Sequence, residues 1–220
     1  MNTIALSNSQ IESKQSFVTA TYKLLTGSLI AGAAGAYLGV QYNHILQPYY
    51  IGLFILSIAL VFATSFARHK EGWNVSLLFS TTTIVGLSLG PVLTYTLGYS
   101  NGASIVSNAF ILTASAFFGL TLYALTTKRN FLGLGKYLFI ALIILVVASI
   151  INLFVGSSLL MIGLSAIAAI LFSFMIVYDT QAIYAGEYDS PISAALGMYL
   201  NIINLFVALI NLLREFTGEK

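Results

Sequence analysis

Four long stretches of this chain carry no charged side chain, and they constrain the fold more than any other feature. The charge-free stretches are residues 24–67, 72–127, 137–178 and 190–213. A helix needs about 20 apolar residues to cross a hydrocarbon core of ~30 Å. Each of the first three stretches is long enough for two such helices and the fourth for one. The sequence therefore predicts seven membrane-spanning helices.

The composition supports an all-α membrane protein. Charged residues make up 7% of the chain, hydrophobic residues make up 58%, and the mean hydropathy is +0.92. An ordinary soluble domain carries roughly 25% charged residues. A water-soluble globule, a disordered chain and a nucleic-acid binder are excluded, so we expect the lipid bilayer and no nucleic acid as a partner. The absence of cysteine excludes disulfides and thiolate chemistry.

Turn signals divide each of the three long stretches near its middle. They lie at 41–48 with Pro48, at 98–102, and at 156–158. We predict a polar N-terminal tail over 1–16 and a transmembrane domain over 17–215. The predicted spans are 20–40, 49–67, 74–97, 103–126, 137–155, 159–184 and 192–213.

The basic residues predict the orientation of the chain in the membrane. The side that holds the N-terminus carries seven of them: Lys14, Lys23, Arg68, Lys70, Lys128, Arg129 and Lys136. Only Arg214 and Lys220 fall on the other side. The positive-inside rule then predicts a cytoplasmic N-terminus and, with seven spans, an external C-terminus. A last span that dips into the membrane and returns would place all nine basic residues inside, so this re-entrant alternative stays open.

Small residues predict where helices approach closely. The first span carries Gly27, Ala31, Gly35 and Gly39 at four-residue spacing. Such stripes let helix backbones approach each other in lipid. In the third span Pro91 removes one backbone hydrogen bond and should kink the helix.

The last span carries a small and polar face. Its members recur every three or four residues: Ser193, Gly197, Asn201, Asn204, Ala208 and Asn211. Because amides need hydrogen-bond partners that lipid lacks, we expect this face to point toward other helices or a wet cavity. Hydrogen bonding between helices explains Asn211 best and Asn201 least well.

Asp179 lies inside the apolar run of the sixth span, and an intramembrane carboxylate is a candidate functional site. Its alternative is a structural aspartate near the interface. If spans six and seven form a hairpin that turns at 190–191, Asp179 and Asn201 lie at similar depth. Burial disfavours a charged carboxylate, and protonation turns it from acceptor to donor, which outlines a pH-responsive gate.

Two further roles depend on Asp179. Its oxygens, with the side-chain oxygen of Asn201, suit weak and transient contact with a hard cation such as Ca²⁺. Arg68 could pair with Asp179 and latch the gate shut, although a topology anchor that reaches lipid phosphates is the stronger interpretation of Arg68.

Catalytic motifs do not support an enzyme. The G-x-S-x-G match at 86–90 lies inside a span, and both histidines, His44 and His69, lie in the connections. An aspartyl protease needs two acids that share a proton, and only Asp179 lies within a predicted span. We expect no catalytic residue and no cofactor.

Several segments together carry a family resemblance. They are Ile176–Ile183 (IVYDTQAI), Met198–Phe206 (MYLNIINLF), Leu209–Leu213 (LINLL), Gly90-Pro91 and Ser149–Phe154 (SIINLF). With seven spans and a short polar N-terminus, they resemble the Bax inhibitor-1 family of membrane proteins. The short tail and compact loops resemble its bacterial branch, which implies the bacterial inner membrane.

The resemblance implies a bundle whose last helix is surrounded by the other six. It also implies a pH-sensitive calcium leak gated by two aspartates on spans six and seven. Asp179 matches the first aspartate, but Asn201 stands at the position of the second. A shifted pH response and weaker cation attraction follow from the missing acid.

Two functions follow from the resemblance. The first is a pH-sensitive, ion-permeable membrane protein, a calcium leak gated around Asp179. The second is a non-conducting regulator, because some bacterial members that lack the paired acids are associated with modulating a membrane-embedded AAA-type protease. The resemblance implies that these members bind the protease through a cytoplasmic N-terminal tail, and residues 1–16 could serve as this tail.

Overall fold

The computed structural model describes residues 2–219, with side chains described from residue 11 onward. This part of the chain is 87% helical and contains no strand, which confirms the all-α prediction. The helices are α1 (Asn2–Gln41), α2 (Asn43–Leu46), η1 (Gln47–Tyr49), α3 (Tyr50–Ala67), α4 (Asn74–Leu87), α5 (Gly90–Leu97), α6 (Gly102–Thr126), η2 (Leu132–Leu134), α7 (Gly135–Val155), α8 (Ser158–Ala185) and α9 (Pro191–Thr217).

Seven helical segments of the described chain are long and apolar enough to cross a membrane, as predicted. They are Ile11–Gln41, Asn43–Ala67, Asn74–Leu97, Gly102–Thr126, Leu132–Val155, Ser158–Ala185 and Pro191–Thr217. The last is the most buried of the seven, with 44% of its most apolar window inside the protein against 33% for the next.

The breaks between helices follow glycine and proline. Gly156 ends α7 with a left-handed backbone (φ 66°), and Gly186 does the same after α8 (φ 82°), a conformation that only glycine adopts without strain. The kink predicted at Pro91 is a full break, since α4 ends at Leu87 and α5 begins at Gly90. Proline is accepted here because the first turn of a helix needs no amide from it.

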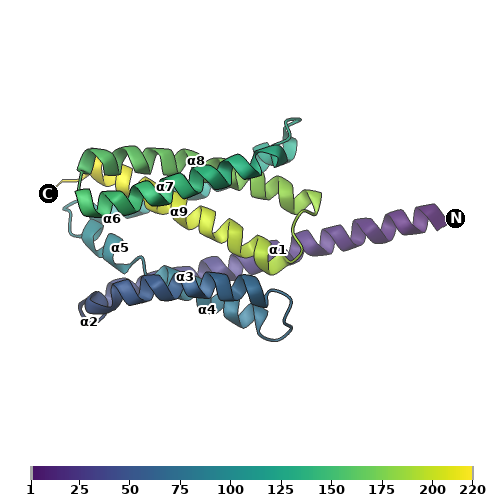
Figure 1. The fold of residues 1–220 in the computed structure, drawn as a ribbon, viewed down its shortest axis with the longest axis horizontal. Coiled ribbons are helices and arrows are strands. Elements are labelled where there is room, and N and C mark those ends of the chain that lie inside the picture. The colour runs from purple at the N-terminus through teal and green to yellow at the C-terminus, as the bar shows by residue number, and fades with distance from the viewer. Residues whose placement is uncertain (1, 220) are drawn as a thin grey trace. The chain divides into compact units, whose positions relative to one another are not determined.

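The chain forms two compact units. The first comprises the chain through Pro91 together with Ala182–Tyr199, and the second comprises Val92–Gln181 and the chain from Leu200 onward. Figure 1 shows the path of the chain through them. Each unit is described by itself.

Close backbone contact joins α1 and α4 in the first unit. A methyl group added to Gly35 would overlap the Thr83 backbone, and one added to Gly86 would overlap the Gly32 backbone. Gly35 of the predicted glycine stripe therefore lies where α1 crosses α4. Gly32 of α1 and Gly86 of α4 lie at the same crossing. The buried Tyr199 of α9 also binds α4 here, because its hydroxyl donates to the Thr82 carbonyl at 2.9 Å.

The C-terminal end of α9 is fixed to the α5–α6 turn in the second unit. Asn101 donates its side-chain amide to the Thr217 carbonyl at 2.5 Å, and the Ser100 amide donates to the Glu219 carbonyl at 2.9 Å. A continuous helix of 27 residues, about 40 Å long, does not return to the side where it began. The re-entrant alternative for the last span is therefore wrong.

The predicted N-terminal tail is helical over its described part. α1 begins at Asn2 and continues without a break into the first span, and Figure 1 shows it running well past the ends of α3 and α4. Its 40 residues make a helix about 60 Å long, twice the thickness of a hydrocarbon core. Residue 1 lies outside the described residues.

Candidate functional site

A carboxylate and an amide meet in the second unit. Asn201 of α9 donates its side-chain N–H to Oδ2 of Asp179 on α8, with 2.6 Å between nitrogen and oxygen. Both side chains are buried, with 4% of Asp179 and 3% of Asn201 exposed. The juxtaposition predicted from the α8–α9 hairpin is confirmed. Among the described residues, Asp179 is the only buried acid.

Both partners sit within regular helices, so the pair has a fixed geometry. Asp179 lies roughly 9 Å along α8 from its end at Ala185, and Asn201 lies roughly 15 Å along α9 from its start at Pro191. The next residue, Thr180, donates its hydroxyl to the Ile176 carbonyl of its own helix at 2.8 Å. The Asp179 carboxylate therefore faces α9 from a continuous helix.

The hydrogen bond between Asp179 and Asn201 depends on the protonation state of the carboxyl group. A short hydrogen bond to a charged acceptor is stronger than one between neutral groups. Protonation of Asp179 removes its charge and part of its accepting capacity, so this bond senses the protonation state. Among the described residues no group of three or more His, Cys, Asp or Glu could hold a metal ion. The pair itself offers few oxygen ligands, which fits only weak contact with a cation.

The other two asparagines of α9 do not share this environment, and Asn204 does not form the hydrogen bond to a neighbouring helix that its place on the polar face predicted. Its side chain is exposed and donates to the Leu200 carbonyl of its own helix at 2.8 Å. Asn211 is partly buried and accepts a hydrogen bond from Arg214, also on α9, at 3.0 Å. An asparagine can satisfy part of the hydrogen-bonding capacity of its side-chain amide within its own helix. The spacing of the asparagines does not reveal which of them do so.

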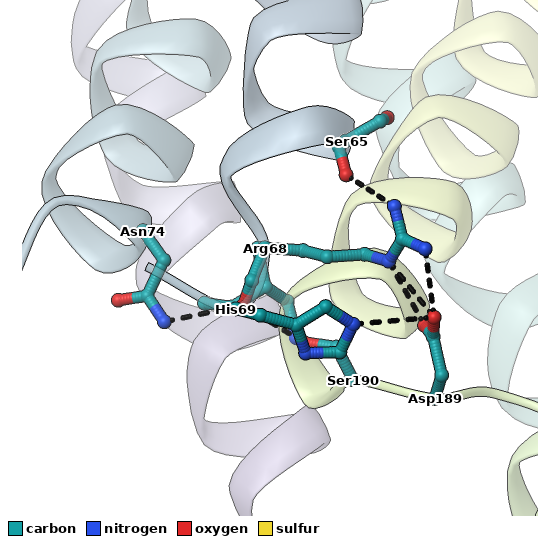
Figure 2. Close-up of polar contacts among 7 residues, drawn as sticks. Ser65, Arg68, His69, Asn74, Asp189 and Ser190 are labelled. Carbon is teal, nitrogen blue, oxygen red and sulfur yellow. Dashed lines mark hydrogen bonds and ion pairs between the residues drawn. The ribbon is translucent and has the colours of Figure 1, made fainter. Parts of the chain in front are cut away.

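Arg68 forms an ion pair in the first unit, as Figure 2 shows. Its Nη2 lies 2.8 Å from Oδ2 of Asp189, and its Nε donates to the same oxygen at 2.9 Å. The sequence suggested Asp179 as the partner of Arg68, and the ion pair that the structure gives it is with Asp189. This ion pair joins the end of α3 to the α8–α9 connection.

Further contacts extend the ion pair into a cluster, which we call the clasp (Ser65, Arg68, His69, Asp189 and Ser190). Arg68 also donates to the Ser65 carbonyl at 2.7 Å, and the Ser190 hydroxyl donates to the Arg68 carbonyl at 3.3 Å. Nε2 of His69 lies 3.3 Å from Oδ2 of Asp189. The hydrogen bond from Arg68, reinforced by His69, lowers the pKa of Asp189 below its ordinary value of 3.8 despite some desolvation.

The lowered pKa of Asp189 predicts how the clasp responds to pH. The stabilisation is fully present above the ordinary pKa of 3.8 and is lost as the pH falls through the lower folded value. We expect Asp189→Asn to lower the thermal unfolding temperature in detergent at neutral pH and to match wild type in strong acid. The neighbouring exposed acid offers a control, since Glu187→Gln should change little at either pH. An Asp189→Asn deficit that persists unchanged in acid would contradict this assignment.

Three residues with defined roles were not predicted from the sequence. Asp189 lies in the connection between two predicted spans, and no local pattern marks its distant partner. Gln181 of α8 binds the end of α6 and the α6–α7 connection through three hydrogen bonds, also without a local signal. Arg214 is buried, with 7% exposed, and its guanidinium carbon lies 4.9 Å from the centre of the Tyr95 ring. Its spacing from Asn211 on one helix face could have indicated their contact.

Seven helical segments of the described chain, each long and apolar enough to cross a membrane, define a multi-pass integral membrane protein. The family described as "Inhibitor of apoptosis-promoting Bax1" matches residues 14–218. The chain therefore belongs to the Bax inhibitor-1 family, as its motifs predicted. This family is generally not enzymatic.

Relatives extend from bacteria to a virus. An uncharacterised protein of Campylobacter jejuni is 43% identical over 92% of this chain and 90% of its own length. An uncharacterised membrane protein of Vibrio cholerae is 35% identical over 88% of this chain and 86% of its own length. The Golgi anti-apoptotic protein of vaccinia virus is 39% identical over 74% of this chain and 67% of its own length.

Proposed function

We propose that this protein is a proton-sensitive, ion-permeable membrane protein, a calcium leak in which Asp179 is the titrating group. The observation that carries the proposal is the buried hydrogen bond between the Asp179 carboxylate and the Asn201 amide. An ionisable side chain inside a membrane-spanning helix is costly, and such residues mark ion pathways and proton relays.

The charge of Asp179 determines the direction in which calcium passage should change with pH. A carboxylate attracts a divalent cation, and its protonated form does not. The uncharged Asn201 orients the carboxylate but adds no negative charge, so cation contact is weak and transient. Calcium passage should therefore fall as the pH falls and Asp179 takes up a proton.

The clasp bears on this proposal because it holds the connection between the two helices of the Asp179–Asn201 pair. Arg68 holds Asp189, which lies in the connection between α8 and α9, the two helices that carry Asp179 and Asn201. We propose Arg68 as a latch that acts on this connection. The seven basic residues on one side favour a cytoplasmic N-terminus, and the bacterial relatives favour the inner membrane.

Calcium flux into liposomes tests the proposal. Purified wild-type protein should pass Ca²⁺ at a rate that falls with decreasing pH, because protonation removes the charge of Asp179. Asp179→Asn should abolish this pH dependence, whereas Asn204→Asp, on the exposed side of α9, should retain it. Tight liposomes at every pH, or equal pH responses of wild type and Asp179→Asn, would contradict a leak governed by Asp179.

A second candidate function is regulation of a membrane-embedded AAA-type protease without ion passage. The observation that favours it is the helical extension of α1, which begins at Asn2 and is exposed over 11–16. Such an extension offers a docking element beyond the span. Removal of residues 2–16 should then change the turnover of the protease's substrates in cells while liposomes stay tight.

A variant that restores the second acid separates the two functions. If wild type conducts, Asn201→Asp should alter an existing flux, because two neighbouring acids titrate in coupled steps. If Asn201→Asp creates a leak that wild type lacks, the regulatory function is favoured instead. Both outcomes come from the same flux measurement.

A further inference from the structure

An apolar groove lies along α6, α8 and α9 within the second unit, with a volume of about 670 Å³. Small side chains shape part of its wall, namely Ala116 of α6 with Ala169 and Ser173 of α8. The Ser173 hydroxyl donates to the Ala169 carbonyl at 2.7 Å, so it presents no free donor to the groove. The wall is therefore suited to hydrocarbon rather than to a polar ligand.

The length of the groove matches one leaflet of a bilayer. Its α6 wall contains Leu112, Ala116, Leu120 and Tyr123, which follow one helix face. These positions extend along α6 for about 16 Å. Half of a ~30 Å hydrocarbon core is about the same distance. A single acyl chain, rather than a membrane-spanning segment, fits this length.

Aromatic rings surround one end of the groove. The Phe131 ring meets the Tyr123 ring edge to face at 6.0 Å between centroids and lies 6.4 Å from the Phe174 ring. All three side chains line the groove. Aromatic side chains are enriched at the level of lipid headgroups, so this end belongs at the membrane interface.

Arg129 lines the same groove, and a single side chain fixes the backbone that carries it. Gln181 of α8 donates to the Arg129 carbonyl at 2.9 Å and to the Ala124 carbonyl at 3.2 Å. Its oxygen accepts the Phe131 amide at 2.8 Å. The connection after α6 is therefore held against α8, with Arg129 at the aromatic end of the groove.

The charge at this end is positive and uncompensated. The connection from 127 to 134 and the first turn of α7 contain Lys128, Arg129 and Lys136 and no acid. No ion pair joins Arg129 to an acid among the residues that the structure describes. A guanidinium binds phosphate through paired hydrogen bonds, and basic pockets between membrane helices bind anionic lipid headgroups.

We propose that this groove binds one anionic phospholipid, with an acyl chain along α6, α8 and α9 and its phosphate on Arg129. The apolar wall and the length of the groove match one acyl chain. The aromatic rings match the level of the headgroup, and Arg129 matches the phosphate. Binding depends on the arginine charge and on the free volume of the groove. Neither Asp179 nor Asn201 lines this groove.

Native mass spectrometry of the purified protein with added phosphatidylglycerol or phosphatidylcholine of matched acyl chains tests the proposal. Wild type should retain one phosphatidylglycerol in preference to phosphatidylcholine. Arg129→Gln should weaken phosphatidylglycerol binding by about tenfold, the effect of losing one charge-assisted hydrogen-bonded contact. Lys128→Gln makes the same charge change beside the groove and should keep the preference. Ala169→Phe, which fills the groove, should reduce retention of both lipids.

Three results would overturn the proposal. Equal losses in Arg129→Gln and Lys128→Gln would indicate general attraction of the basic connection for anionic lipid. Unchanged retention in Ala169→Phe, with native helix content by circular dichroism, would place the lipid elsewhere. A wild-type dimer that Ala169→Phe dissociates would make the groove an interface between two copies of this chain.

Discussion

Asn201→Leu is expected to lower the free energy of unfolding by about 2 kcal/mol, because it removes a donor from the buried Asp179 carboxylate. Leucine has the same branched arrangement of four side-chain heavy atoms as asparagine, so most of the effect reports the lost hydrogen bond. Unfolding in mixed micelles with increasing denaturing detergent measures this free energy. The same helix offers a matched control in Asn204→Leu, which changes an exposed side chain and should shift stability by less than about 0.5 kcal/mol.

A double-mutant cycle separates the pair from its surroundings. If the carboxylate and the amide interact, Asp179→Leu should cost less in the Asn201→Leu background than in wild type. Additive losses, or equal losses from Asn201→Leu and Asn204→Leu, would mean that the 2.6 Å contact contributes nothing to stability.

Gly86→Ala is expected to destabilise the protein by about 2 kcal/mol or more, because the added methyl group overlaps the Gly32 backbone and forces α1 away from α4. Alanine is otherwise the better helix former by about 1 kcal/mol, so the loss arises from the helix crossing. Unfolding in mixed micelles measures this change as well.

The identical substitution at Gly119 provides the control. An added methyl group there meets nothing within 4 Å, so Gly119→Ala should leave stability unchanged or raise it. The opposite signs of the two effects are the prediction. A Gly86→Ala protein as stable as wild type would show that α1 and α4 do not need their close approach.

The seven spans could be predicted from the sequence because membrane thickness sets helix length and charge is excluded from the core. All seven predicted spans end within four residues of the observed helical segments. The first helix starts earlier than predicted, since polar residues form helix equally well once they lie outside the hydrocarbon core. Charge and hydropathy patterns locate the bilayer boundary, and not the first residue of the helix.

The candidate site could be predicted only where local geometry determines it. Asp179 and Asn201 lie eleven residues before and after Ser190, so their contact follows from chain connectivity. The partnership of Arg68 with Asp189 depends on how α3 packs against the α8–α9 connection, and no spacing encodes it. Asn204 bonds to its own helix and not to a neighbouring one, because three- and four-residue steps spread side chains over a wide arc of the helix.

Difference infrared spectroscopy of wild type and Asp179→Asn across pH measures the protonation of this one buried carboxyl group directly. The proposed function predicts a protonated-carboxyl band that grows as the pH falls, is missing in Asp179→Asn, and moves when Asn201 is replaced by leucine. Its midpoint should coincide with the midpoint of the fall in calcium flux. A flux that changes with pH while the Asp179 band stays constant would contradict the proposal that protonation of Asp179 governs ion passage.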